Sequence, residues 1–193
     1  MDKHYWVFDL DGTLTLPVHD FVHIRNELDI PQDQDILETI NSYDGPRKHK
    51  ALQQLDALES YYASLAQPAP GAIELVDMLG EKGCRLGILT RNTKPLARLS
   101  LDAIGVRDYF DTQDILGRDE ALPKPSPEGI HFLLNQWKGH PSRAVMVGDY
   151  HFDLLAGRSA SVITVHVDSS ERHWPEDTDV RVNTLHDLRK LIV

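Results

Sequence analysis

Short runs of apolar residues, separated by stretches with helical periodicity, constrain the fold of this chain more than any other feature. The runs are rich in Val, Ile and Leu, and they are apolar almost without interruption. Such runs are typical of strands that are buried on both faces of a parallel sheet. Four clear runs lie at residues 4–8, 84–90, 143–148 and 161–167, and a weaker one lies at 109–115.

Helical patterns lie between these runs. Apolar residues recur at helical spacing over residues 71–82, 95–104, 126–137, 152–160 and 184–191. The third of these helices is expected to begin with Ser126 as its N-cap and Pro127 in its first turn, because both residue types favour those positions. Strands that alternate with helices predict an α/β fold with a Rossmann-like, doubly wound parallel sheet.

One stretch breaks the alternation, because no good strand lies between the first and second apolar runs. Helical patterns fill it at residues 20–28, 34–40 and 47–65, with a turn at 41–46 and a Pro-rich linker at 67–71. We interpret residues 17–69 as a small helical insertion after the first strand. Residues 1–16 and 70–193 are then expected to form one core.

Composition excludes several classes of protein. The chain has 193 residues with 20 Lys and Arg against 30 Asp and Glu, a net charge of −10 that disfavours binding to a phosphate backbone. No apolar run approaches the ~18 residues of a membrane span, and no signal peptide is recognisable. The single Cys84 excludes an internal disulfide and a cysteine-based zinc site. A cytoplasmic location is therefore expected, with no membrane or nucleic-acid partner, and the oligomeric state is left open.

Carboxylates follow the ends of two expected strands. Asp9 and Asp11 end the first run, and Gly12 allows a sharp turn there. Asp149 ends the third run, and Asp153 follows near the start of a helix. Ligands of open parallel sheets bind beyond the carboxyl ends of the strands, so we expect these four acids to form one cluster. Two like charges ~4 Å apart repel by about 4 kcal/mol at an effective dielectric of 20, so the cluster needs a cation. Oxygen ligands favour a hard ion, of which Mg²⁺ is the usual one beside phosphate.

Two further residues are expected at the same edge. Thr90 ends the second run, and Lys124 lies between Pro123 and Pro125, which restrict the local backbone. Together these side chains suit phosphoryl transfer. One carboxylate attacks phosphorus to form an aspartyl-phosphate, and the second protonates the leaving oxygen and later activates water. The cation, Lys124 and Thr90 would hold the phosphoryl oxygens.

Four motifs in order resemble those of the haloacid dehalogenase-like hydrolases. The segment FDLDGTL at residues 8–14 resembles the family signature, and ILTRN at 88–92 resembles the second motif. The segment PKPSPE at 123–128 resembles the third motif and VGDYHFD at 147–153 the fourth. The motifs span most of the chain, and four in order are a strong signal.

The resemblance implies a role for each residue. Asp9 would be the nucleophile and Asp11 the general acid and base, while Thr90 and Lys124 would bind the phosphoryl group. Asp149 would ligate Mg²⁺ together with Asp9 and the backbone carbonyl of Asp11. Asp153 would lie in or beside the shell around the metal, although it could instead be a plain acid at a helix N-terminus. The insertion resembles the cap of phosphoglycolate phosphatase-like members, which closes over the site and selects the substrate.

The residues that would select the substrate depart from that subgroup. Tyr150 stands where the family often has a small residue, and Arg91 and Asn92 replace an Asn-Lys pair. Asn92 is expected to bind substrate, and Arg91 either does so or pairs with a neighbouring acid. Arg47 belongs to a basic cluster that is either a solvated helix face or reaches the site when the cap closes. The leading substrate is a two- or three-carbon phosphate ester with its own carboxylate, such as phosphoglycolate.

Other functions remain open from the sequence. A phosphomutase or a phosphonate hydrolase of the same family would use a similar set of residues, and the latter would add a cap lysine such as Lys48 or Lys50. A dehalogenase is disfavoured because it needs neither a metal nor Asp11. A phosphorylation-switched module would keep its aspartyl-phosphate, and a non-catalytic binding protein would not form one.

Overall fold

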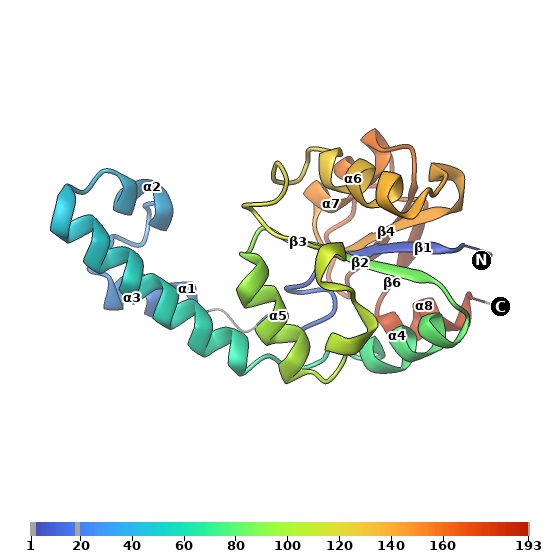
Figure 1. Ribbon diagram of the computed structural model, residues 1–193, viewed down its shortest axis with the longest axis horizontal. Coiled ribbons are helices and arrows are strands. Elements are labelled where there is room, and N and C mark those ends of the chain that lie inside the picture. The colour runs from blue at the N-terminus through green and yellow to red at the C-terminus, as the bar shows by residue number, and fades with distance from the viewer. Residues whose placement is uncertain (1–2, 18–19, 193) are drawn as a thin grey trace.

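The core of the molecule is a sheet of six parallel strands in the order β3-β2-β1-β4-β5-β6 (Figure 1). The computed structural model describes residues 3–17 and 20–192. The strands are β1 Tyr5–Phe8, β2 Arg85–Leu89, β3 Ile115–Leu116, β4 Ala144–Gly148, β5 Ile163–Val167 and β6 Val180–Val182. Adjacent strands pair in parallel throughout, which confirms the prediction of a Rossmann-like doubly wound sheet.

Helices cover both faces of the sheet (Figure 1). One face carries α4 Ala72–Glu81, α5 Lys94–Ala103 and α8 Leu185–Lys190, and the other carries α6 Glu128–Trp137 and α7 His151–Ser159. Short 3₁₀ turns, η1 Arg107–Tyr109, η2 Thr112–Asp114 and η3 Pro141–Arg143, lie in the connections. The molecule is therefore a three-layer α/β structure around the sheet.

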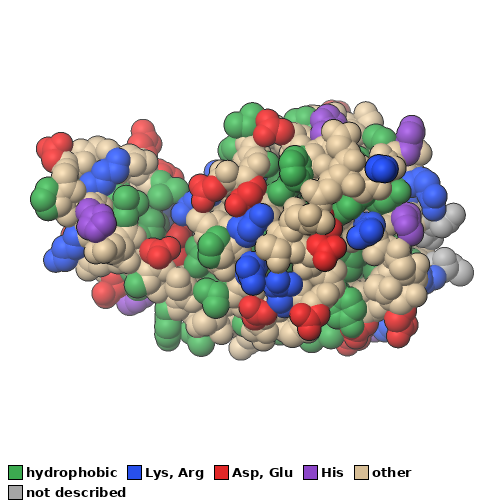
Figure 2. Space-filling model, in the orientation of Figure 1, with side chains coloured by type: hydrophobic (Ala, Val, Ile, Leu, Met, Phe, Trp, Pro, Cys, Tyr) green, Lys and Arg blue, Asp and Glu red, His purple; other side chains and the backbone are tan. Residues whose placement is uncertain are grey.

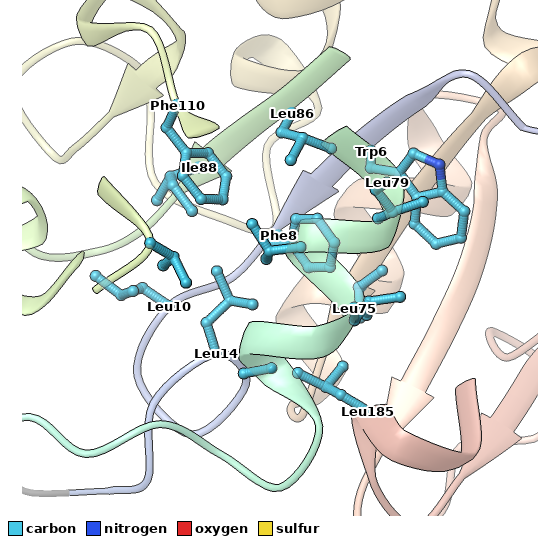
Figure 3. Packing of buried hydrophobic residues seen from close by; sticks show 14 of the residues in the cluster. Trp6, Phe8, Leu10, Leu14, Leu75, Leu79, Leu86, Ile88, Phe110 and Leu185 are labelled. Atoms are coloured by element: carbon cyan, nitrogen blue, oxygen red, sulfur yellow. The ribbon is translucent and has the colours of Figure 1, made fainter. Parts of the chain in front are cut away.

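Alternate residues of each strand enter opposite hydrophobic cores. Trp6 and Phe8 of β1 are fully buried against Leu75 and Leu79 of α4, as Figure 3 shows. Val7 between them points to the other face and joins the cluster of α6 and α7. Each such side chain contributes about 1.5–3 kcal/mol when it is fully buried. This double-sided burial explains why the strands are almost continuously apolar in sequence.

The strand order reverses at β1. The chain passes from β1 to β2 and β3 on one side, then crosses to β4 on the other side of β1. In open α/β sheets the crevice at this switch point, beyond the carboxyl ends of the strands, is where ligands bind. The residues that follow β1 and β4 are therefore adjacent in space, although about 140 positions separate them in sequence.

Three helices project from the core between β1 and α4, and they lie at the left in Figure 1. They are α1 Phe21–Glu27, α2 Ile36–Asn41 and α3 Gly45–Ser64, and we call residues 21–64 the helical lobe. The lobe has a hydrophobic cluster of its own, formed by Ile24, Leu28, Ile30, Ile36, Ile40, Ala51 and Leu55. Helix α3 packs against α5, and Arg118 of the core lies 3.7 Å from Glu59 of α3. The predicted boundaries of the insertion, residues 17–69, remain a prediction.

The two ends of the segment that holds the lobe are joined by backbone contacts. The amide of Leu16 donates to the carbonyl of Gln67 at 2.9 Å, and Thr15 forms a β-bridge with Pro68. The chain therefore leaves and re-enters the core at almost the same point.

Some element boundaries differ from those expected. The weak run at 109–115 is mostly 3₁₀ turn, and its strand, β3, begins only at Ile115. The edge strand β6 was not predicted, because three residues with Arg181 in the middle carry little apolar pattern. The expected cap of α6 was wrong by one residue, since Pro127 is the N-cap and Ser126 precedes it. Within the described residues, no helix combines the length and apolar character needed to cross a membrane.

Candidate active site

The predicted residues meet beyond the carboxyl edge of the sheet. Asp9 directly follows β1, Thr90 follows β2 and Asp149 follows β4, and these three strands are adjacent. Lys124 comes from the loop between β3 and α6, and Asp153 lies in the first turn of α7. The parallel order of the strands therefore gathers side chains from four distant parts of the sequence.

Lys124 links two of the acids. Its Nζ lies 2.5 Å from Asp9 Oδ1 and 2.6 Å from Asp153 Oδ1, and all three side chains are buried. Burial alone would lower the pKa of the Lys124 ammonium, but the charges of Asp153 and Asp9 raise it above its ordinary value. Lys124 is therefore a fixed positive charge in the site.

The acids repel one another. Burial, and then the charges of Asp153 and Asp149, raise the pKa of Asp9 from 3.8 to about 8, although Lys124 opposes the shift. The pKa of Asp149 is also raised, by burial and by Asp153, against a hydrogen bond from Thr13. Without a bound metal ion, negative charge at this cluster is costly even with Lys124 present.

Three carboxylates are close enough to share a metal ion. One oxygen each from Asp9, Asp149 and Asp153 lies within 4.8 Å of the others. The donors are all oxygen, and their mutual repulsion raises pKa values that a divalent cation would lower again. The residues therefore fit a hard ion such as Mg²⁺. Asp153 is already engaged on both oxygens, since Oδ1 contacts Lys124 and Oδ2 accepts from the amide of Tyr150 at 3.0 Å.

The turn after β1 brings Asp149 against the chain. Gly12 has φ +94°, and a Cβ there would lie 2.9 Å from Asp149 Oδ2. Only glycine combines that left-handed backbone with so close an approach. Thr13 Oγ1 lies 3.3 Å from Asp9 Oδ2 and 3.2 Å from Asp149 Oδ1, so its one proton is shared between them. Thr13 received no role from the sequence, although its place directly after Gly12 is a signal for one.

Asn92 orients the second acid of the first motif. Its Nδ2 donates to Asp11 Oδ2 at 2.9 Å, and its backbone amide donates to Thr90 Oγ1 at 3.1 Å. Thr90 is buried, whereas Asp11 is only partly buried. Asp11, two residues after Asp9 and beyond the end of β1, thus contacts the segment that follows β2 and lines the cavity.

A cavity of about 580 Å³ lies between these residues and the helical lobe. Figure 2 shows a notch between the lobe and the core. Eight of the predicted site residues line the cavity: Asp9, Asp11, Thr90, Arg91, Asn92, Lys124, Asp149 and Asp153. Arg47 does not occur among the described residues that line it, and its guanidinium lies 3.9 Å from the centre of the Tyr43 ring within the lobe. The structure therefore does not bring Arg47 to the other predicted residues.

The cavity also has lining residues that the sequence did not single out. Arg25 and Glu59 come from the lobe, and Arg118 comes from the core. Tyr150 and Phe152 lie within the fourth motif, and the exposed Arg91 has its guanidinium 5.7 Å from the centre of the Phe152 ring. Only Tyr150 carried a sequence signal, as a departure from the family pattern.

A buried histidine supports Asp149 from behind. His166 Nε2 lies 3.2 Å from the backbone oxygen of Asp149, and burial lowers the pKa of this histidine. A neutral ring with its proton on Nε2 donates to that carbonyl. Asp149 therefore reaches the cavity from a backbone that is held on its other side.

Comparison with known proteins gives consistent similarities. A family model described as haloacid dehalogenase-like hydrolase matches residues 6–167. The chain is 29% identical over 205 residues to a haloacid dehalogenase-like hydrolase domain-containing protein of Arabidopsis thaliana, covering 96% of this chain and 82% of that one. It is 28% identical over 176 residues to the pyrophosphatase PpaX of Bacillus velezensis, covering 83% and 81% of the two chains. The structure of a predicted phosphoglycolate phosphatase from Haemophilus somnus matches with a TM-score of 0.79 at 18% identity, over 100% of this chain and 99% of that one, which shows a shared fold.

Proposed function

This chain belongs to the haloacid dehalogenase-like hydrolase family, and on that premise we propose that it is a Mg²⁺-dependent phosphatase of small phosphate monoesters. The observation that carries the proposal is the convergence of Asp9, Asp11, Thr90, Lys124 and Asp149 on one cavity at the sheet edge. The similarity to PpaX, a pyrophosphatase by name, supports chemistry at phosphorus.

Asp9 is proposed as the nucleophile. One of its carboxylate oxygens forms a bond to phosphorus as the bond from phosphorus to the ester oxygen breaks. Asp11 gives its proton to the departing oxygen, so that a neutral alcohol leaves. Asp11 then takes a proton from water, whose oxygen attacks phosphorus and releases phosphate and the Asp9 carboxylate. Asn92, which donates to Asp11 at 2.9 Å, orients that carboxyl for both proton transfers.

The other residues manage charge. Lys124, 2.5 Å from Asp9, favours the ionised form of the nucleophile and neutralises phosphoryl oxygens in the transition state. Thr90 offers its hydroxyl to one of those oxygens. Asp9, Asp149 and the backbone carbonyl of Asp11 would hold Mg²⁺, which would supply further positive charge to the phosphoryl oxygens. Asp153 anchors Lys124, which it contacts at 2.6 Å.

The cavity lining bears on the phosphonate hydrolase alternative. That chemistry would need a lobe lysine in the site for a Schiff base. Among the described lining residues Lys124 is the only lysine, and it is already paired with two acids. Neither Lys48 nor Lys50 lines the cavity, so phosphoester hydrolysis fits the described site better.

Phosphate release tests the proposal. A panel of small phosphate esters is offered to the protein with and without Mg²⁺, and Asp9→Asn protein serves as the blank. We expect Mg²⁺-dependent release, with kcat at least about a thousandfold lower in the folded Asp9→Asn variant. Steady turnover by that variant would contradict the role of Asp9. No release from any ester by folded, Mg²⁺-supplied protein would contradict the phosphatase function and favour a mutase or a binding protein.

A further inference from the structure

The two sides of the cavity differ in character. The side formed by the sheet edge is charged. The side formed by the lobe presents the apolar residues Ile24, Ile36, Leu37 and Leu55, and we call it the apolar side, although Arg25, Asp35 and Glu59 of the lobe also line the cavity. A volume of about 580 Å³ falls within the roughly 300–1,000 Å³ of sites for drug-sized ligands. The phosphoryl group occupies the charged side, so the apolar side is left for the alcohol that departs. A leaving group of two or three carbons would leave most of that side unfilled.

Two aromatic rings stand between these sides. Tyr150 is 45% exposed, Phe152 is partly buried, and both line the cavity. Their rings meet edge to face at 5.3 Å, and the ring of Trp174 meets that of Tyr150 edge to face at 5.5 Å and stacks on His151 at 4.9 Å. The rings are therefore fixed by packing before a ligand arrives. Each ring already has a planar guanidinium over it, Arg91 at 5.7 Å from the centre of Phe152 and Arg172 at 5.9 Å from that of Tyr150. Aromatic rings held in this way can also take planar ligand groups.

The charges of the cavity do not call for a second anionic group on the substrate. Six carboxylates and four cationic side chains are found among the described lining residues. Three of those cations are engaged: Lys124 by Asp9 and Asp153, Arg118 by Glu59 at 3.7 Å, and Arg25 by the carbonyl of Gln34 at 3.0 Å. A substrate carboxylate would enter a site where acids already outnumber bases.

We propose that the natural substrate is a phosphate monoester whose leaving alcohol is uncharged and carries an aromatic ring, seated between Tyr150, Phe152 and the apolar lobe residues. Nucleosides and aryl alcohols share this chemistry. The inference rests on the proposed phosphatase function and names the substrate class of that site. It replaces phosphoglycolate, because six carboxylates against four cationic side chains line the cavity and Arg47 is not among those cations.

Matched pairs of esters isolate the contribution of the ring. Uridine 5′-monophosphate and ribose 5-phosphate share the ester oxygen and the sugar but differ in the base. Benzyl phosphate and propyl phosphate make the same comparison without a sugar, and 2-phosphoglycolate tests the carboxylate. We expect kcat/KM to be at least about tenfold higher for the ring-bearing member of a pair. A preference within the first pair alone identifies a nucleoside, and a preference within the second alone identifies an aryl alcohol.

Variants of Tyr150 and Phe152 test whether these two rings cause the preference for ring-bearing esters. Tyr150→Ser removes the ring and keeps a good N-cap for α7, and Phe152→Leu keeps apolar bulk without the planar face. Each is expected to reduce the ratio of kcat/KM values within a pair by at least about fivefold. Tyr61→Ser is the matched control, because Tyr61 is 58% exposed on α3 and does not line the cavity, and it should leave the ratio unchanged.

Binding to Asp9→Asn protein separates recognition from turnover. Calorimetry with Mg²⁺ present is expected to show uridine 5′-monophosphate binding at least about tenfold more tightly than ribose 5-phosphate. Equal kcat/KM within both pairs, or a preference for 2-phosphoglycolate, would overturn the inference and leave the phosphatase function standing. Absence of phosphate release from every ester would overturn both.

Discussion

Asp9 lies in a buried site beside other carboxylates of the same charge. Asp9 lies in contact with Lys124, yet its pKa is raised to about 8 because burial and two neighbouring acids outweigh that contact. Without a bound metal ion, an aspartate with this pKa would be mostly protonated near neutral pH. The residue thus depends on a cation for its reactive form, which ties catalysis to the metal.

Proton release on metal binding is the first prediction. Because Asp9 must lose its proton to bind Mg²⁺, the apparent affinity should rise with pH up to about 8, by as much as roughly tenfold per pH unit. Calorimetric titration at pH 6, 7 and 8, in buffers of different ionisation enthalpy, measures both the affinity and the protons released. An affinity that is flat over this range would show that Asp9 binds the ion already ionised.

The stability of the metal-free protein should change in the opposite direction. The pKa of Asp9 is about 8 in the folded protein and near its ordinary value of 3.8 when unfolded, so the folded state binds more protons between these limits. The contribution of Asp9 to the free energy of unfolding is therefore fully present at low pH and is lost as the pH rises towards 8. Thermal melts with a chelator from pH 5 to 8 should show this loss, which Asp9→Asn removes and Mg²⁺ reverses most strongly at pH 8.

Gly12→Ala tests the close approach of Asp149 to the turn after β1. The substitution meets both an unfavourable φ of +94° and a clash at 2.9 Å, so we expect it to destabilise the protein by about 1–3 kcal/mol and to abolish most activity. Gly105→Ala is the control, because Gly105 has φ +76° with nothing within 4 Å of the added Cβ. Urea unfolding and phosphate release should show that Gly105→Ala loses stability but keeps its kcat. Full activity in Gly12→Ala would mean that Asp149 does not need its present position.

Among the elements, α3 links the lobe to the core most extensively. It packs against α5, and its Glu59 lies 3.7 Å from Arg118 at the cavity wall. The helix also carries Arg47 near its N-terminus, away from the described lining residues. Glu59 of α3 can therefore contact a substrate, whereas Arg47, twelve positions earlier on the same helix, lies away from the cavity lining.

Arg118→Ala and Arg47→Ala distinguish these positions. We expect Arg118→Ala to raise KM several-fold across esters, since its loss removes the cation that lies 3.7 Å from Glu59 at the cavity wall. Arg47→Ala should leave KM and substrate ratios near those of the parent protein, because Arg47 contacts Tyr43 within the lobe and is not among the described residues that line the cavity. Steady-state kinetics on the ester panel measures both. A larger effect from Arg47→Ala would indicate that the lobe closes far enough to bring Arg47 in, as its basic cluster first suggested.

Sequence patterns predicted the elements that have a regular apolar pattern and the functional residues that directly follow them. Buried strands are apolar throughout, so β1, β2, β4 and β5 were found, and the residues after them followed from the parallel order. Short edges such as β3 and β6 bury too few residues to leave a pattern. Contacts made by the lobe, such as that between Arg118 and Glu59, depend on how α3 lies on the core. No local pattern encodes that placement, and for the same reason Arg47 was assigned to the site while Arg25 was not.

The whole molecule has separate hydrophobic centres. The two clusters beside the sheet and the cluster of the lobe share no residue in the part of the chain that the structure describes. A small cluster of short helices buries less apolar surface than the sheet, so it should open more readily. Local stability is therefore expected to be lower in the lobe than in the core.

Hydrogen exchange with Ile40→Ala tests this separation. Ile40 is fully buried in the lobe, and its truncation should cost about 2–5 kcal/mol there. We expect amide exchange to accelerate across residues 21–64 while the strands beside Asp9 keep their protection. Leu79→Ala, a buried truncation in α4, should show the converse and accelerate exchange in the sheet. Uniform acceleration in both variants would show that lobe and core unfold as one unit.

The hydrogen bond from Leu16 to Gln67 has a consequence for how such molecules can diversify. A segment whose two ends are joined by a backbone hydrogen bond can be lengthened, shortened or exchanged for another without moving the strands on either side. The core would then keep the chemistry at Asp9, and the exchanged lobe would determine substrate selectivity. The same joint is where a protein engineer would graft a foreign lobe to give this scaffold a new choice of ester.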